Sequence, residues 1–376
     1  MITSVKIGGT AVDLNTINHD VTITVGRRDI TTSFAPSSCR ITFYDVVAST
    51  YTALVGKTLT VAGTAYQLFG GYITDVRLTV ATATSGARCD IIAAGPSSRL
   101  GLMTANQSGY ASMTVSGRLF SIAQECTTQD ATMKFNAEVG SSESLYTISS
   151  AAAQPDSATS LMQNVVEPYG GLIYDNPYDD TSPTGRIAYY MNDALIIFPG
   201  EVAGNQVEWS PTFEQSGQII NDVTVTYDTG TINRSNTTSQ TLYGKRSRRV
   251  TTTIDNATNA TDLADNVISR SRRPRWSISN VSVIQSTTGA EFLYQRIGGS
   301  LKITSLPAGS PTSTYTGIVQ GWEHRVSNGK MRTTFYLADP SDVGKSIRWQ
   351  DTGSNWTPTN ATLIWDNALT EADFYS

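Results

Sequence analysis

Apolar and polar residues alternate with a period of two along most of the first segment of the chain. The alternation is clearest in VTITVGRRDI, CRITFYDVV, KTLTVAG, QLFGGYITDVRLTV and RCDIIAAG, which short stretches rich in Gly, Ser and Ala separate. A period of two places successive side chains on opposite faces of a strand, and closely spaced strands are typical of sandwiches and barrels. Residues 1–98 are therefore predicted to form an all-β domain.

The period changes to that of a helix after this segment. SGRLFSIAQECTTQ places Leu119, Ile122, Ala123 and Cys126 on one face, and Ser116 is available as its N-cap. The pattern predicts an amphipathic helix packed by that face.

A second, shorter helix is predicted in PDSATSLMQNVVEPYGG. Leu161, Val165 and also Met162 are candidates for its inward face, and Asp156 or Ser157 caps the start. Apolar strands then flank a polar loop in GLIYDNPYDDTSPTGRIAYY, which indicates a hairpin. Residues 99–200 are predicted to form a small α+β domain.

Strand patterns return over residues 201–345, in INDVTVTYDTG, RRVTTTID, WSISNVSVIQ, GSLKITSL, YTGIVQGWEHRV and MRTTFYLAD. One helix, TDLADNVISRSRR, interrupts them. The fold class predicted is mainly β with some α: two β-barrel-like domains, at 1–98 and 201–345, with the small α+β domain of 99–200 between them. Residues 346–376 form a C-terminal tail.

Composition agrees with this class. Hydrophobic residues make up 39% of the chain and charged residues only 16%, against roughly 25% charged in an average domain. The formal net charge of -5 gives no support for a nucleic-acid-binding protein. Cys39, Cys89 and Cys126 are odd in number and far apart, so we expect buried thiols rather than a disulfide framework or a zinc site. No apolar run is long enough for a membrane helix, and we expect no membrane insertion.

His324 is one of only two histidines and lies in GWEHRVSNGKMRTTFYLADP. A catalytic role requires a nucleophile or a second acid or base nearby, and the sequence offers none. Asn328 and Gly329 form the residue pair typical of a type I′ turn. The segment is predicted to be a hairpin in which a neutral imidazole packs or bonds locally.

Two further clusters have an open interpretation. Asp175, Asp179 and Asp180 could bind calcium, but they lack the alternation of an EF-hand loop, so we favour a solvated hairpin tip. The basic segments KRSRR and RSRRPR could contact phosphate or an acidic partner subunit. The acidic chain favours the partner interpretation. The residues predicted to contact a partner or another subunit are Lys245, Arg246, Arg248, Arg249, Arg270, Arg272, Arg273 and Arg275.

No GxSxG, HExxH, P-loop or strand-to-helix GxGxxG motif occurs. We therefore predict no catalytic residues, no metal site and no cofactor, and expect that the protein is not an enzyme. Paired carboxylates of a polysaccharide-degrading enzyme stay open, because their pairing depends on the tertiary structure.

Four stretches together resemble the tail hub, or baseplate hub, family of phage tail-associated proteins. They are VTITVGRRDITTSFAPSSCRITFYD, LFGGYITDVRLTV with CDIIAAGPSSRLG, SATSLMQNVVEPYGGLIYDN with GRIAYY, and IVQGWEHRVSNGKMRTTFYLADP with LIWDNALTEADF. The last resembles the final hairpin and tail of minor tail proteins in siphophages of actinobacteria. The resemblance covers nearly the whole chain.

The resemblance implies a structural virion protein at the tail tip, made in the host cytoplasm. It implies a homotrimer whose six β domains match a hexameric tail tube to threefold symmetry. The ring would enclose a channel for the tape measure protein and DNA, with the basic segments outside it. The other partners implied are the distal tail protein or tail tube protein and further tail tip or receptor-binding proteins. We expect no enzyme domain after the last hairpin.

A receptor-binding or carbohydrate-binding tail tip protein is the alternative. Trp349, Trp356 and Trp365 could stack on sugars.

Overall fold

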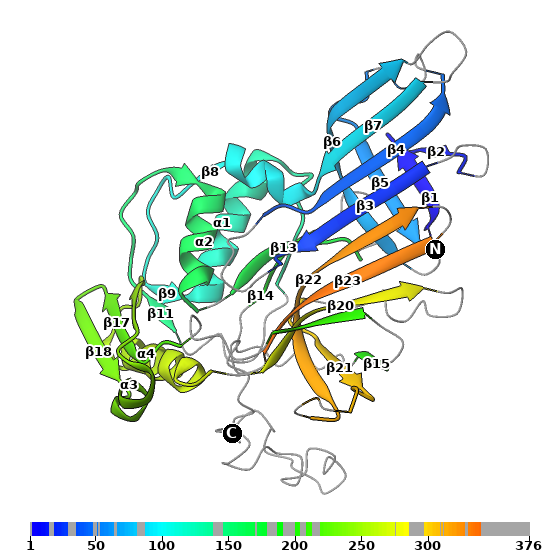
Figure 1. Cartoon of the computed structure of the whole chain (residues 1–376). Helices are drawn as coiled ribbons and strands as arrows, with labels where there is room; N and C mark the ends of the chain where they lie inside the picture. The colour runs from blue at the N-terminus through cyan, green and yellow to red at the C-terminus, as the bar shows by residue number, and fades with distance from the viewer. Residues whose placement is uncertain are drawn as a thin grey trace, which may run out of the picture.

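Strands from the two ends of the chain join in one large sheet in the computed structural model (Figure 1). The structure describes residues 2–14, 19–28, 35–47, 51, 53–63, 66–80, 87–137, 146–169, 171–178, 186–190, 200–203, 208–212, 219–274, 276–285, 297–308, 310, 312–327 and 330–339.

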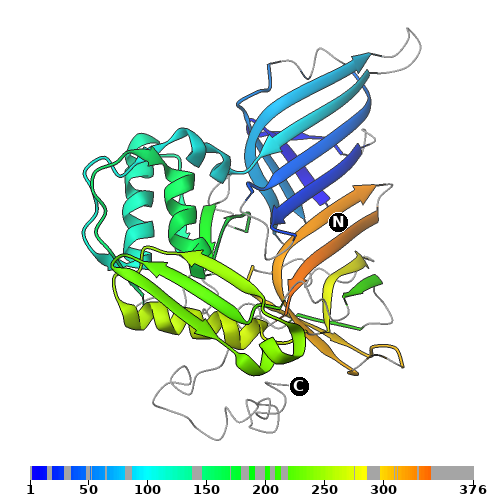
Figure 2. The same ribbon diagram turned by 60° about the vertical axis from the view of Figure 1, so that its left-hand side comes forward.

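The N-terminal half of this sheet has the strand order β3-β4-β7-β6-β5-β1-β2, with antiparallel neighbours. Its strands are β1 (Ile2–Ile7), β2 (Thr10–Val12), β3 (His19–Gly26), β4 (Ser38–Val46), β5 (Thr58–Gly63), β6 (Gln67–Val80) and β7 (Ala87–Ala94). Figure 2 shows this half curling on itself. The alternate residues Ile23, Ile41 and Ile91 are fully buried on the inner face, as the period of two predicts.

The C-terminal half has the order β16-β20-β23-β22, and β21 pairs with both β22 and β15. Its strands are β15 (Gly200–Ala203), β16 (Glu208–Thr212), β20 (Ser277–Gln285), β21 (Ser300–Thr304), β22 (Tyr315–Ser327) and β23 (Lys330–Ala338). The predicted hairpin is confirmed, because β22 and β23 pair antiparallel up to Ser327 and Lys330. Asn328 and Gly329, between them, lie outside the described residues.

The two halves meet where β3 pairs with β22, from Gly26 opposite Gly321 to Val21 opposite Val326. Most buried apolar residues of both halves accordingly belong to one hydrophobic core. This continuity goes beyond the sequence-based expectation of two separate β domains. The pattern of a strand identifies its buried face, but a partner strand about 300 residues away leaves no local signal.

A second core lies beside the sheet and contains the helices (Figure 1). Leu119, Ile122, Met162 and Val165 from two helices are buried in it. The elements of residues 96–190 are η2 (Pro96–Leu102), β8 (Thr104–Ala105), β9 (Met113–Thr114), α1 (Val115–Gln129), β10 (Phe135–Ala137), β11 (Thr147–Ile148), β12 (Asp156–Ser157), α2 (Ala158–Val166), η4 (Glu167–Tyr169), β13 (Leu172–Asn176) and β14 (Arg186–Tyr190).

Both predicted helices of this region are confirmed, with one change of cap. Thr114, not Ser116, caps α1, because its hydroxyl accepts a hydrogen bond from the Gly117 N–H. Ser157 caps α2 by accepting from the Ser160 N–H. The predicted hairpin is also confirmed as β13 paired with β14.

Residues 219–274 pack on this second core, although the sequence groups them with the strands of 201–345. They form β17 (Asp222–Tyr227), β18 (Gly230–Ser235), α3 (Thr237–Tyr243), β19 (Ser247–Thr251) and α4 (Ala257–Ser271). The strands make a sheet in the order β18-β17-β19, against which α4 packs (Figure 2). The predicted third segment therefore contributes to both cores, and the domain boundaries stay a prediction.

The prediction of a mainly β chain with a small α+β region is confirmed. Helix α4 begins at Ala257, earlier than the pattern indicated, because Asn256 caps it. The short α3 has no amphipathic period and was not predicted. In the part of the chain that the structure describes, no helix is both long and apolar enough to cross a membrane.

Candidate assembly surfaces

Two glycines allow the halves of the large sheet to join. Gly26 ends β3 with φ +76°, and a Cβ there would lie 2.4 Å from the carbonyl oxygen of Gln320. Opposite it, a Cβ at Gly321 would lie 2.5 Å from the carbonyl oxygen of Val25. Such distances are far below van der Waals contact, so only glycine fits either position. We call this junction, with the arginines that follow Gly26 and their partners on β22, the seam.

A buried arginine holds the seam from the β3 side. Arg27 is only 7% exposed. Its Nε and Nη2 both donate to Gln320 Oε1, at 3.0 and 2.7 Å. Its backbone N–H also donates to the Gln320 carbonyl at 3.0 Å. Because charge-assisted hydrogen bonds are strong and a buried charge without partners is costly, this pair fixes how β3 meets β22.

A second arginine pair lies next to it and is partly exposed. Arg28 forms an ion pair of 3.0 Å with the buried Glu323 and lies over the ring of Tyr336, 5.7 Å from its centroid. Arg325 donates to the other oxygen of the same carboxylate. Glu323 therefore has an arginine on each oxygen and connects β3 to β22.

His324, in the same strand, is buried and bonds locally, as predicted. Its Nδ1 lies 2.9 Å from Thr333 Oγ1 on β23, and its ring is only 1% exposed. Burial lowers the pKa of His324 to about 3, because an apolar environment disfavours the charged imidazolium. The imidazole is therefore neutral and packs within the hairpin.

Asp175 corrects the prediction of a solvated hairpin tip. Its side chain is buried at 3% exposure at the end of β13. The carboxylate accepts hydrogen bonds from the N–H groups of Ser37 and Ser97 and from the Ser97 hydroxyl. It links the second core to the large sheet. Asp179 and Asp180 lie outside the described residues, within which no group of three metal-ligand side chains occurs.

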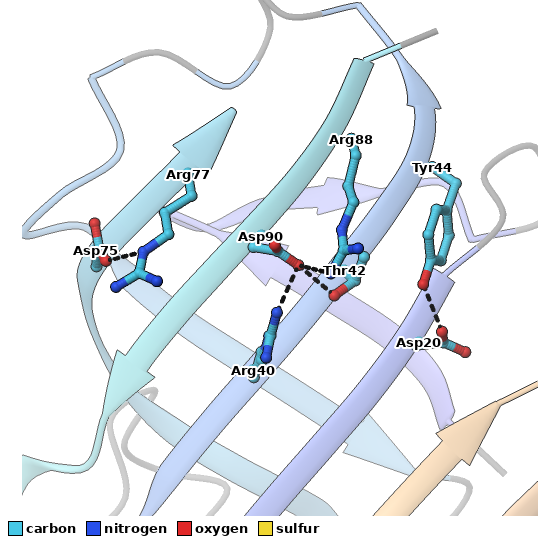
Figure 3. Close-up of polar contacts among 8 residues, drawn as sticks. All are labelled: Asp20, Arg40, Thr42, Tyr44, Asp75, Arg77, Arg88 and Asp90. Atoms are coloured by element: carbon cyan, nitrogen blue, oxygen red, sulfur yellow. Dashed lines mark hydrogen bonds and ion pairs between the residues drawn. The ribbon is translucent and has the colours of Figure 1, made fainter. Parts of the chain in front are cut away.

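Charged side chains cover the outer face of the N-terminal half (Figure 3). Asp90 on β7 is their centre, and it accepts from Thr42 at 2.5 Å and pairs with Arg40 at 3.3 Å and Arg88 at 3.2 Å. Burial acts to raise the pKa of Asp90, but the hydrogen bonds from Thr42 and Arg88 and the charge of Arg40 outweigh it, so that the pKa lies below its usual value. Its carboxylate is therefore held ionised.

Two further contacts complete this face. Arg77 pairs with Asp75 at 2.8 Å, and the Tyr44 hydroxyl donates to Asp20 at 2.8 Å. The face drawn in Figure 3 thus carries three arginines and three aspartates. Exposed pairs of this kind add little stability.

The two basic segments, by contrast, come together through a buried asparagine. Asn221 is fully buried, and its Nδ2 donates to Ser239 Oγ at 3.1 Å and to the Gly244 carbonyl at 2.8 Å. Its Oδ1 accepts from the Arg246 N–H at 2.8 Å. Ser239 in turn donates to the Arg272 carbonyl at 2.6 Å. The start of KRSRR and the end of α4 are therefore held at one end of the three-stranded sheet.

The predicted contact residues differ in their surroundings. Lys245 pairs with Asp222 at 3.1 Å. Arg246, Arg248 and Arg249 are exposed at and along β19, and Arg273 is exposed after α4. The side chain of Arg270 and the whole of Arg275 lie outside the described residues, as do Trp349, Trp356 and Trp365. Sequence reasoning missed the seam residues, although a glycine within a strand pattern is a known sign of close backbone approach.

Solved structures of phage tail proteins share this fold. The 43 kDa tail protein of prophage MuSo2 from Shewanella oneidensis matches 92% of this chain and 100% of its own, with a TM-score of 0.65 and 11% identity. A tail protein from Neisseria meningitidis matches 90% of this chain and 98% of its own, with a TM-score of 0.64 and 11% identity.

A third similar structure comes from a secretion system. It is an Escherichia coli component of the type VI secretion system, itself described as similar to the bacteriophage T4 tail proteins gp27 and gp5. It matches 86% of this chain and 74% of its own, with a TM-score of 0.53 and 9% identity. No protein-family profile and no curated protein sequence matches the chain. The similarity is therefore one of fold.

Proposed function

We propose that this chain is a structural tail protein that forms a trimeric hub at the tip of a phage tail. The hub adapts the hexameric tail tube, or the distal tail protein, to threefold symmetry and encloses the channel through which the tape measure protein and DNA pass. The observation that carries the proposal is the match of nearly the whole chain to nearly whole tail proteins, one of prophage MuSo2 and one from Neisseria meningitidis.

The seam gives this role a physical basis. A tail tube transmits load and must keep its bore, so each subunit has to present its two β halves at a constant angle. Gly26 and Gly321 allow the halves to pair closely, and the buried Arg27–Gln320 contact resists sliding. Three such subunits supply six β halves around one axis, which is the number that a hexameric tube requires.

The proposed partners are the distal tail protein or tube protein, the tape measure protein and other tail tip or receptor-binding proteins. Contacts with them are made by protein surfaces, and the chain carries out no catalysis. We assign the basic segments around Arg248 and Arg273 to the outside of the ring. A net charge of -5 favours a channel wall to which DNA does not adhere.

The first experiment is the mass of the purified chain by light scattering and native mass spectrometry. A species near three times 40.5 kDa is expected, and electron microscopy should then show six β halves around a threefold axis. A monomer that also fails to trimerise with co-expressed tail tube and distal tail proteins would contradict the proposal. A trimer with Arg248 and Arg273 lining the bore would contradict only the placement of the basic segments.

A further inference from the structure

Three arginines at the edge of the three-stranded sheet have no partner among the described residues. The side chains of Arg246, Arg248 and Arg249 make neither an ion pair nor a hydrogen bond with any residue that the structure describes. Eight other arginines pair with carboxylates: Arg28, Arg40, Arg77, Arg88, Arg99, Arg234, Arg325 and Arg332. The edge therefore carries excess positive charge in an acidic chain.

Among the described residues, the backbone of β19 is open on the same side from Ser247 to Thr251; beyond it, the Thr253 carbonyl already accepts from the Ser149 N–H. In the described part of the chain β19 pairs only with β17, in parallel. The Arg246 carbonyl accepts from Asp222, and the Thr252 N–H donates to Thr226, so even-numbered residues direct their backbone groups toward β17. Because successive residues of a strand direct these groups to opposite sides, the N–H and C=O of Ser247, Arg249 and Thr251 point outward.

The two strand arginines lie on opposite faces of this edge. Arg248 and Val250 share a face, and they stand opposite the buried Val223 and Val225 of β17. Arg249 lies on the other face, opposite Thr224. A strand added beside β19 would therefore have one guanidinium above it and one below it.

We propose that the β19 edge binds an extended acidic segment of a partner protein, which adds to the sheet as a fourth strand. Its backbone pairs with Ser247, Arg249 and Thr251, and two adjacent carboxylates, which point to opposite faces, pair with Arg248 and Arg249. Strand addition provides affinity through main-chain hydrogen bonds, and the paired charges provide specificity. The proposal depends on the assembly role above only in that it requires a partner protein.

Charge and the open backbone groups together favour an acidic peptide over two other occupants of this edge, a second copy of the chain and a nucleic acid. A second copy of the same edge would bring Arg248 and Arg249 against identical arginines, and like charges on paired strands repel, so the edge disfavours self-association. A nucleic acid would use the charges but not the row of outward N–H and C=O groups. Only a peptide with acidic side chains satisfies both features.

The test uses the full chain and a fluorescent peptide of about ten residues, with alternating Val and Thr around a central Asp-Glu pair. Fluorescence anisotropy should show saturable binding that weakens at least about tenfold when Asp-Glu is changed to Asn-Gln, or when Arg248→Glu and Arg249→Glu are combined. A peptide with proline at alternate positions should also lose binding, because proline has no N–H to pair. The Lys6→Glu, Lys57→Glu double variant makes the same charge change on the large sheet and should bind normally.

Other outcomes overturn the proposal. Equal binding of the proline peptide, or tighter binding of a single-stranded oligothymidine of equal charge, would indicate a general anion surface instead of strand addition. Absence of peptide binding by the wild-type chain would also refute it. The trimer mass is measured on the same samples, so that a failure of the strand site can be told apart from a failure of the hub proposal. Circular dichroism checks that both double variants are folded.

Discussion

Ser97 donates both its backbone N–H and its hydroxyl to the buried carboxylate of Asp175, each at 2.8 Å. Ser97 lies in the first turn of η2, just after the last strand of the N-terminal half, and Asp175 is the penultimate residue of β13. The Ser37 N–H, just before β4, donates to the same carboxylate at 2.7 Å. One side chain thus joins three segments that are far apart in the sequence, and it connects the helical region to the large sheet.

Asp175→Asn should lower the free energy of unfolding by about 2 to 4 kcal/mol. The amide NH₂ cannot accept a hydrogen bond, so at least one of the buried groups that now donate to the carboxylate would lose its acceptor. Urea unfolding followed by circular dichroism measures this change. Asp262→Asn, at an exposed position of α4, is the matched control and should change stability by less than about 0.5 kcal/mol. Equal losses of stability in the two variants would show that the Asp175 contacts do not stabilise the fold more than an exposed aspartate does.

Gly26→Ala should be among the most damaging small substitutions in the chain. The added Cβ would lie 2.4 Å from the Gln320 carbonyl oxygen, so β3 and β22 must separate, at a cost of more than about 3 kcal/mol. Gly9 has a similar positive φ of +85° but nothing within 4 Å of its Cβ position. Gly9→Ala should therefore cost only the backbone strain of about 1 kcal/mol. Thermal unfolding of both variants separates the steric effect from the conformational one.

Gln320→Leu should destabilise the seam by about 2 to 4 kcal/mol, because it removes an acceptor that takes two hydrogen bonds from the buried Arg27 guanidinium. Arg28→Ala removes the neighbouring pair, in which the arginine side chain is 65% exposed, and should cost no more than about 1 kcal/mol. Hydrogen exchange would locate the effect, with faster exchange of β3 and β22 amides expected in Gln320→Leu. A larger loss of stability in Arg28→Ala than in Gln320→Leu would contradict the importance given to Arg27.

The burial of His324 predicts a defined dependence of stability on pH. The folded state keeps the imidazole neutral down to a pKa of about 3, whereas the unfolded chain takes up a proton below about 6.5. Stability is therefore lost as the pH falls from about 6.5 to about 3, and this residue alone accounts for about 2 kcal/mol at pH 5.

His324→Gln should lose about 2 kcal/mol less than wild type between pH 7 and pH 5, as measured by urea unfolding at both values. His19→Gln removes the other histidine and leaves His324 in place, so its pH-dependent loss should persist. If the free energy of unfolding falls equally in wild type and in His324→Gln between pH 7 and pH 5, the buried imidazole is not the cause of the pH dependence.

Asn221→Ala should loosen the end of the three-stranded sheet where the basic segments meet. The change leaves the Arg246 N–H and the Gly244 carbonyl without their buried partner, at a cost of about 1 to 3 kcal/mol. Hydrogen exchange should accelerate at β17 and β19 but not in the large sheet. Asn233→Ala, which removes only an exposed bond to Thr224, should leave exchange unchanged; acceleration by both variants would argue against a special role for Asn221.

Local sequence patterns predicted the longer strands and three of the helices. The strands β3 to β7, β13, β14, β17 and β19 to β23 follow from a period of two, and α1, α2 and α4 follow from a period of 3.6. The strands β1, β15, β16 and β18 were not predicted. The closing hairpin and the buried, neutral state of His324 could be inferred in the same way, from a strand pattern, a turn signal and the lack of any reactive neighbour. Burial of Cys39, Cys89 and Cys126 followed from their spacing.

Other features required the tertiary structure. The sequence places Asp175 in a polar loop, and only the folded chain shows that Ser37 and Ser97 lie against its carboxylate. The pairing of β3 with β22 joins residues about 300 positions apart, and the Asn221 contacts bring together two basic segments that the sequence separates. A sequence pattern specifies which face of an element is buried, but which elements meet depends on packing the whole chain at once, since many pairings bury the same faces equally well. The sequence by itself therefore determined the elements and their buried faces, and the tertiary structure decided the seam, the Asp175 link and the arginine edge.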